Sequence, residues 1–93
     1  MNGIKNLLNL KVLDASFNKI RDCEGLISLT KVQVLNLANN EINSLDHFDT
    51  LLAMKECDLR FNEITAWEPI KKIIKLPSME VIFLEGNKVY WFV

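Results

Sequence analysis

The chain has 93 residues, of which 49% are hydrophobic and 25% are charged, and its formal net charge at pH 7 is −1. This balance is typical of one folded domain, because a disordered segment has fewer apolar residues and a higher net charge. A chain so close to neutral has no broad basic field to attract phosphate backbones. A nucleic-acid partner is therefore not expected.

The apolar stretches of the sequence are short. The longest ones, such as residues 81–84, fall far below the ~20 residues that cross a bilayer, so we expect neither a transmembrane helix nor a membrane partner. Residues 1–5 lack the basic and apolar regions of a signal peptide. Cys23 and Cys57 are the only cysteines, and we expect both to be free thiols. This cysteine usage favours a reducing, cytoplasmic location.

An internal repeat organises the chain. Four asparagines, separated by 22, 22 and 25 residues, share the same apolar surroundings: Asn18, Asn40, Asn62 and Asn87. The segments around them, LKVLDASFNKI, VQVLNLANNEI, MKECDLRFNEI and MEVIFLEGNKV, follow the pattern L-x-x-L-x-L-x-x-N-x-L. We count repeat position 1 from Leu10, Val32, Met54 and Met79. The single domain, residues 1–93, then divides into a partial turn, 1–9, and four repeats, 10–31, 32–53, 54–78 and 79–93.

The first half of each repeat predicts a strand and a turn. Apolar residues at positions 4 and 6 alternate as in a strand with one buried face, and equivalent strands stacked about 4.8 Å apart form a parallel sheet. The asparagine at position 9 follows the strand, where the chain turns inward. Its carboxamide can satisfy backbone groups that water cannot reach. We therefore interpret the four asparagines as a structural ladder and not as a ligand site.

The second half of each repeat is expected to return on the convex side. Apolar residues at position 14 and three residues later suit short 3₁₀ or α turns, and they are Cys23, Leu45, Trp67 and Phe92, followed by Leu26, Phe48 and Ile70. The third repeat is three residues longer and contains EPIKKIIKLP. Here we expect a short helix that starts at Pro69, ends before Pro77 and buries one face, consisting of Ile70, Ile73 and Ile74.

These motifs resemble the 22-residue subclass of leucine-rich repeats, typified by the leucine-rich regulatory subunit of protein phosphatase one. Residues 64–87, ITAWEPIKKIIKLPSMEVIFLEGN, are similar to the last full turn of axonemal dynein light chain 1 and of tubulin-folding cofactor E. The resemblance implies an α/β fold, a right-handed solenoid whose concave parallel sheet recognises a protein. Two departures are Lys88, where the family usually has Pro, and the lack of terminal caps. The chain is thus expected to be a fragment, or one part of a larger protein.

Positions 3, 5 and 7 are expected to point out of the concave sheet, because strand side chains alternate between faces. They combine an apolar stripe, one aromatic anchor and an excess of carboxylates, which favours a protein partner that carries Lys or Arg. The candidate contact residues are Val12, Asp14, Val34, Asn36, Asp58, Arg60, Val81, Phe83 and Glu85. Phe17 and Phe61, one position further on, are expected to pack over the asparagine turn.

Catalysis and metal binding have little support. The one histidine, His47, lies near Ser44, Asp46 and Asp49 in a convex loop, where residues so close in sequence cannot adopt the oriented geometry of a catalytic triad unaided. The same group lacks a fourth convergent metal ligand. We expect no enzyme activity, no cofactor and no metal.

Two kinds of function remain. The first is a protein-recognition module or scaffold that uses the concave sheet, and the second is an assembly piece that stacks through uncapped ends at Ile4, Leu7, Trp91 and Phe92. On resemblance alone, a cytoskeletal partner, dynein heavy chain or tubulin, ranks before a phosphatase. The cytoplasmic location leaves an axonemal or a nuclear one open.

Overall fold

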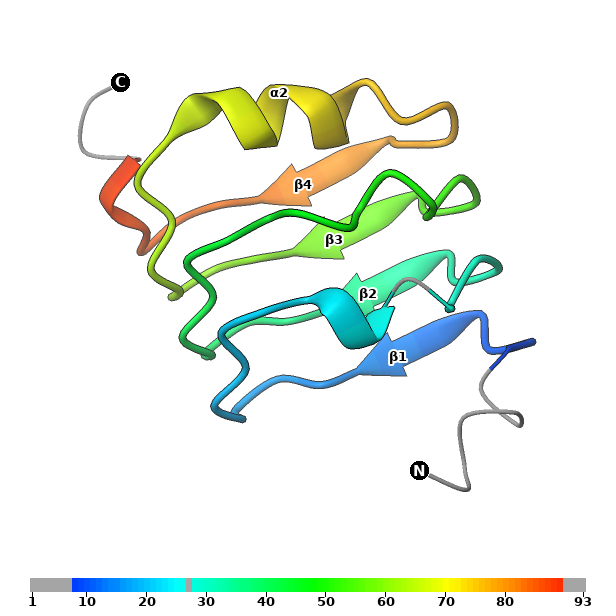
Figure 1. Ribbon diagram of the computed structural model, residues 1–93, viewed down its shortest axis with the longest axis horizontal. Helices are drawn as coiled ribbons and strands as arrows, with labels where there is room; N and C mark the ends of the chain where they lie inside the picture. Colours follow the sequence, from blue (N-terminus) through cyan, green and yellow to red (C-terminus); the bar gives the residue numbers. More distant parts are fainter. Residues whose placement is uncertain (1–7, 27, 90–93) are drawn as a thin grey trace.

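The computed structural model describes residues 8–26 and 28–89. Four strands, β1 (Val12–Asp14), β2 (Val34–Asn36), β3 (Glu56–Asp58) and β4 (Val81–Phe83), form one parallel sheet in the order of the sequence (Figure 1). Each strand occupies positions 3 to 5 of its repeat. The predicted α/β architecture with a short parallel sheet is confirmed.

The register of the sheet pairs equivalent residues of successive repeats. Val12 pairs with Val34, Val34 with Glu56, and Glu56 with Val81. The three extra residues of the third repeat leave this register unchanged, so they are accommodated outside the sheet. Backbone hydrogen bonds continue beyond the strands, for example from Leu37 N to Asp58 O at 2.8 Å. The stacking of the repeats therefore includes the turns that follow the strands.

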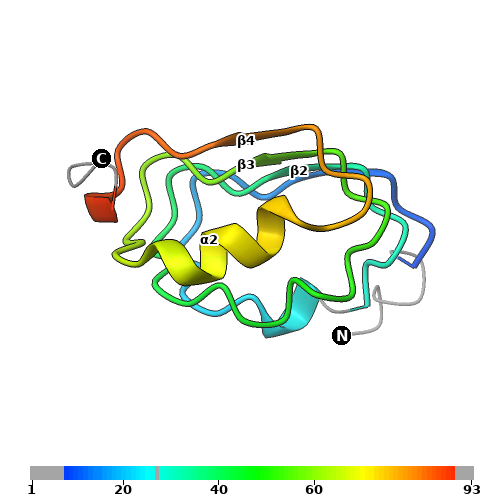
Figure 2. The same ribbon diagram turned by 90° about the horizontal axis from the view of Figure 1, so that it is seen from above.

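The return segments form a second layer beneath the sheet (Figure 2). The first repeat has a 3₁₀ turn, η1 (Glu24–Leu26), and the third has the expected helix, α2 (Trp67–Ile74). Pro69 is the third residue of α2 and not its first. Proline is tolerated there because the N–H groups of the first helical turn have no partner within the helix.

The buried face of α2 is narrower than the sequence predicted. Ile70 and Ile73 are 0% and 2% exposed, whereas Ile74 is 50% exposed. Including Ile74 in the buried face was wrong, because it lies about 100° around the helix from Ile73. Trp67 packs against the core but is only half-buried, so part of its side chain stays exposed.

The core lies between the sheet and the return segments, and it is best packed in the middle of the stack. Leu35 and Leu37 of the second repeat and Leu59 of the third are all 0% exposed. Their counterparts in the first repeat, Leu13 and Ala15, are only half-buried. The end residues expected to make stacking contacts, Ile4, Leu7, Trp91 and Phe92, lie outside the described residues.

Candidate functional site

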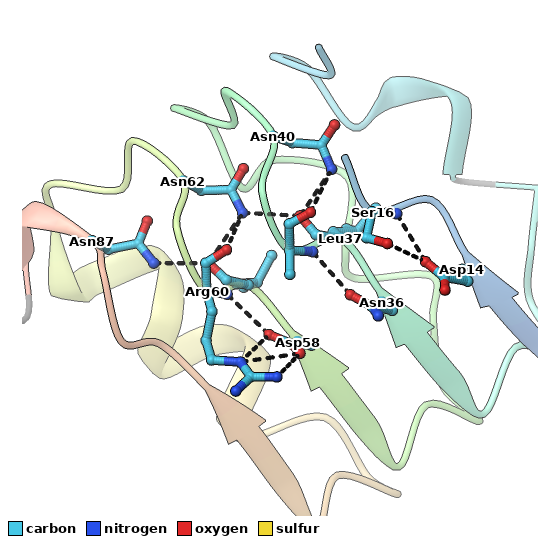
Figure 3. A network of polar contacts seen from close by, with 11 residues as sticks. Asp14, Ser16, Asn36, Leu37, Asn40, Asp58, Arg60, Asn62 and Asn87 are labelled. Atoms are coloured by element: carbon cyan, nitrogen blue, oxygen red, sulfur yellow. Dashed lines mark hydrogen bonds and ion pairs between the residues drawn. The ribbon is translucent and has the colours of Figure 1, made fainter. Parts of the chain in front are cut away.

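Three asparagines form a buried ladder just beyond the strand ends (Figure 3). Each Oδ1 accepts the N–H that lies two residues after the asparagine of the preceding repeat: Ile20 N to Asn40 at 3.1 Å, Ile42 N to Asn62 at 3.0 Å and Ile64 N to Asn87 at 3.0 Å. Each Nδ2 donates to carbonyls of its own and the preceding repeat. For Asn62 these are Leu59 O at 3.1 Å and Leu37 O at 2.9 Å. The three side chains therefore use their hydrogen-bonding groups to connect successive repeats.

Asn18 differs from the other three asparagines. It is exposed, and among the described residues its Nδ2 donates only within its own repeat, to Ala15 O at 2.9 Å and Ser16 O at 3.0 Å. The expectation of four equivalent members was therefore wrong for Asn18. The physical reason is that β1 is an edge strand, so within the described residues no earlier repeat supplies a third backbone segment.

A second row of polar side chains, at position 5, caps the same turn. The Oδ1 atoms of Asp14, Asn36 and Asp58 each accept the N–H of position 7, in Ser16, Ala38 and Arg60, at 3.0 Å (Figure 3). Sequence reasoning treated these three residues only as partner contacts and missed the caps. The sequence did contain a signal for the caps, because Asp or Asn recurs at position 5 of the first three repeats, two residues before the N–H that it accepts.

Hydrogen bonding changes the acidity of Asp14. The Ser16 hydroxyl donates to its Oδ1 at 2.6 Å in addition to the Ser16 N–H. These two bonds lower the pKa of Asp14 from its ordinary 3.8. The carboxylate therefore carries a negative charge on the exposed face of β1 at neutral pH.

Asp58, Arg60 and Phe83 form one cluster on the concave face. Arg60 donates from Nε to Oδ1 of Asp58 at 3.0 Å and from Nη2 to Oδ2 at 2.7 Å. Burial alone would raise the pKa of Asp58, but the hydrogen bonds and charge of Arg60 outweigh it and lower the pKa. The Arg60 guanidinium carbon lies 5.2 Å from the centroid of the Phe83 ring. Phe83 is half-buried, so it is not the freely exposed anchor that the sequence predicted.

The valines of position 3 provide the open apolar part of this face. Val12 is 62% exposed, Val81 is 37% exposed, and Val34 is half-buried. In the register, Glu56 stands between Val34 and Val81 and interrupts the stripe. Glu85 is also exposed. The concave face thus presents apolar patches with carboxylates beside them.

Position 8 has a left-handed backbone in every repeat. The φ angles are 57° at Phe17, 60° at Asn39, 59° at Phe61 and 82° at Gly86. Glycine and asparagine adopt this conformation readily, whereas other residues lose roughly 1–3 kcal/mol. The Phe61 ring lies against Gly86, where an added Cβ would collide with it. Phe17 is 79% exposed, so the expectation that it packs over the asparagine turn was wrong.

A recess of about 380 Å³ lies on the convex side, between residues 45–49 and α2. His47 lines it with Asp46, Asp49 and Glu68, but none of the described lining residues is a Ser, Thr or Cys. Within residues 8–26 and 28–89, no group of three His, Cys, Asp or Glu side chains is suited to hold a metal ion. In the same part of the chain, no helix has the length and apolar character needed to cross a membrane.

Comparison with known proteins agrees with the repeat pattern and the sheet. A family model described as Leucine Rich repeats (2 copies) matches residues 8–50. The solved structure titled "Crystal structure of TLR13-ssRNA13 complex" is similar over 87% of this chain, with a TM-score of 0.71 and 31% sequence identity. The chain has a leucine-rich-repeat fold.

This leucine-rich-repeat chain spans 12% of the length of that matched chain. No curated protein matches it significantly. Leucine-rich repeats in general are protein-interaction folds whose curved sheets serve as binding surfaces. The particular partner has to be argued from the site, because a shared fold does not fix a function.

Proposed function

We propose that this leucine-rich-repeat chain is a non-enzymatic protein-recognition module or scaffold that binds its partner through the concave sheet. The observation that carries the proposal is the alignment of Val12 and Val34 in the register, with the exposed Val81 on the same face. Exposed apolar side chains become strong contacts when a partner excludes water from them. The neighbouring Glu56 and Glu85 favour a partner surface that carries Lys or Arg.

The size of the sheet limits the affinity of this chain by itself. Four strands spaced about 4.8 Å apart give a surface only some 15–20 Å wide. A standard interface covers roughly 800 Å² on each partner, which is more than this sheet offers comfortably. We therefore expect weak binding by the 93 residues and tighter binding by any longer protein that contains them.

Substitutions on the two faces of the molecule test the proposal. Val12→Glu and Val34→Glu place a charge on the concave face, and we expect each to weaken partner binding at least tenfold, about 1.4 kcal/mol. His47→Ala on the convex side is the matched control and should leave binding unchanged. Circular dichroism checks that each variant is folded. Unchanged binding by both valine variants would refute the concave surface.

Sequence resemblance supports a cytoskeletal partner, dynein heavy chain or tubulin, ahead of a phosphatase. The cysteine usage supports a cytoplasmic location, with the axoneme and the nucleus as the alternatives. The test is direct binding to purified tubulin, a dynein motor fragment and protein phosphatase one. Exclusive capture of the phosphatase would reverse the ranking.

The second candidate function is assembly by end-to-end stacking. Its support is the first repeat, where Leu13 and Ile20 are half-buried although the equivalent Leu35 and Ile42 are 0% exposed. The edge of β1 also has no neighbouring strand among the described residues. Such an edge can pair with another chain. Sedimentation over a wide concentration range should reveal self-association, and a monomer at high concentration with a sharp, high melting transition would exclude it.

A further inference from the structure

Phe17 and Phe61 belong to a row of residues at position 8, which we call the rim and which also contains Asn39 and Gly86. The rim follows the ends of the strands, and hydrogen bonds between repeats fix its backbone. Phe17 N donates to Ala38 O at 3.0 Å, Asn39 N to Arg60 O at 2.9 Å, and Phe61 N to Glu85 O at 2.9 Å. Side chains of the rim are therefore presented on a rigid support.

The two phenylalanines are unfavourable choices for the fold alone. Both have a left-handed backbone, with φ angles of 57° and 59°, although Asn39 and Gly86 show that the turn forms with residues suited to it. Both are also exposed, 79% at Phe17 and 55% at Phe61. Phe61 gains a contact with Gly86, which offsets part of its cost. Backbone strain combined with exposed aromatic surface at matching positions indicates a functional constraint.

The surroundings of the rim define what it can contact. The two phenylalanines lie two repeats apart, which places their Cα atoms about 10 Å from each other at one strand spacing per repeat. A polar recess is lined by Glu41 and Glu63, which follow rim residues by two positions, and by Arg21, which follows Phe17 by four. Arg21 pairs with Glu41 at 3.1 Å, and the neighbouring Glu63 is exposed. The rim thus presents two exposed aromatic side chains, and the acidic side chain of Glu63 follows Phe61 by two positions.

We propose that Phe17 and Phe61 form a second protein-contact site, which takes an extended partner segment with two apolar side chains about 10 Å apart and a flanking Lys or Arg that reaches Glu63. Aromatic side chains suit this role because they bury a large area and lose little conformational entropy. In a segment with the polyproline II conformation, which has three residues per turn and rises about 3.1 Å per residue, apolar residues three positions apart lie on one face with a spacing of about 9 Å, close to that of the two phenylalanines. The site extends the concave surface and rests on the proposed function.

The first test measures stability and needs no ligand. Phe17→Asn introduces the residue that the second repeat uses at this position. We expect it to raise the thermal midpoint of the full chain by about 4 °C or more, since it relieves the left-handed strain. Phe61→Asn should change the midpoint less, because it also removes the contact with Gly86. A lower midpoint in Phe17→Asn would show that Phe17 serves the fold, and it would overturn the proposal.

The second test measures binding with a defined probe, the hexapeptide Lys-Leu-Ser-Gly-Leu-Lys with blocked ends. Amide NMR of the full chain should show saturable shifts at Phe17, Asn39 and Phe61, with the dissociation constant raised at least tenfold in Phe17→Asn and Phe61→Asn. A peptide with Ser in place of both Leu should not bind. A peptide with Glu in place of both Lys should bind more weakly.

The outcomes separate this site from the concave surface. His47→Ala on the convex side, outside both proposed surfaces, should leave peptide binding at the rim intact. Absent shifts at the rim, or unchanged affinity in both phenylalanine variants, would overturn the rim site and leave the concave proposal standing. Binding of the protein partner that is lost in Phe17→Asn but not in Val12→Glu would instead overturn the concave surface as the main contact.

Discussion

At the scale of single residues, Cys57 is a fully buried thiol in the core. It occupies the inward-facing position of β3, where β2 has Leu35 and β4 has Ile82, and it is 0% exposed. Burial raises the pKa of the Cys57 thiol far above its ordinary 9.0. Burial, together with the negative charge of Asp22, raises the pKa of Cys23 to about 12.

We predict that both cysteines are inert in the folded chain and reactive in the unfolded one. The thiolate is the reactive form, and its population is negligible at pH 8 when the pKa is so high. A thiol titration should find slow reaction without denaturant and two thiols in denaturant without any reductant. Finding fewer than two thiols in the denatured chain would show that one or both are oxidised.

Asp58 makes stability depend on pH. Its pKa in the folded chain lies below the ordinary 3.8, so its carboxylate stabilises the fold above about pH 4, and this stabilisation is lost as the pH falls through the folded value. Asp58→Asn keeps an oxygen for the cap, as Asn36 does, but removes the ion pair. We expect a loss of about 1 kcal/mol at pH 7, because the Arg60 side chain is 44% exposed to screening solvent.

The measurement is urea unfolding at a series of pH values from 7 to 3. The free energy of unfolding should fall less steeply between about pH 5 and pH 3 in Asp58→Asn than in the natural sequence. Parallel curves for the two proteins would show that Asp58 does not contribute to acid sensitivity.

At the scale of elements, the asparagine ladder ties each turn to the one before it, and its members differ in their importance. Asn62 is buried and bonds to Ile42 N and to the carbonyl of Leu37, whereas the bonds of Asn18 in the described part of the chain stay within its own repeat. We predict that Asn62→Ala costs about 3 kcal/mol or more, since it leaves several buried backbone groups unsatisfied. Asn18→Ala should cost less than about 1 kcal/mol, because water can replace its bonds. Chemical denaturation measures both, and equal losses would contradict a ladder that begins at Asn40.

Helix α2 offers a second matched pair of variants. Ile73→Ala removes a side chain that is 2% exposed and should cost about 2–5 kcal/mol. Ile74→Ala removes a neighbour that is 50% exposed, and we expect a change within about 1 kcal/mol. Thermal and urea unfolding can compare the two. A larger loss in Ile74→Ala would mean that the face of α2 has been assigned incorrectly.

Sequence periodicity predicted the strands and α2 because alternation and spacing determine which positions can be buried. It could not separate Ile73 from Ile74, since that depends on how α2 is rotated against the sheet. In the candidate site, the outward direction of Val12 followed from alternation. The contact of the Arg60 guanidinium with the Phe83 ring could not be predicted in this way, because it depends on the side-chain conformation of Arg60, which alternation does not determine. The recurrence of Asp or Asn at position 5 could have predicted the caps, but the sequence analysis interpreted these residues as partner contacts.

At the scale of the whole molecule, the sheet pairs each repeat only with its neighbours in sequence. The two middle strands pair on both sides, and within residues 8–26 and 28–89 β1 pairs with β2 alone. In such stacked proteins, stability is approximately a sum of repeat and nearest-neighbour contributions. The first repeat should therefore open more easily than the middle of the stack.

Native-state hydrogen exchange can measure this gradient. The amides of Leu37 and Leu59, which donate to carbonyls of the next repeat at 2.8 and 2.9 Å and are 0% exposed, should exchange slowly. The amide of Ala15 also donates at 2.8 Å, to Asn36 O, but it lies in the half-buried first repeat and should exchange faster. Uniform exchange at all three amides would indicate one cooperative unit.

The longer third repeat shows where the chain can accept additional residues. Asn87 follows Asn62 by 25 positions instead of 22, yet the Ile64 N–H still reaches Asn87 at 3.0 Å. The convex side thus tolerates insertions, while the spacing from strand to asparagine is constant. Residues 32–53 duplicated in tandem would offer the same donors and acceptors at each new junction. Such a copy would widen the sheet by one strand, about 4.8 Å, and would lengthen the concave face without altering the residues already on it.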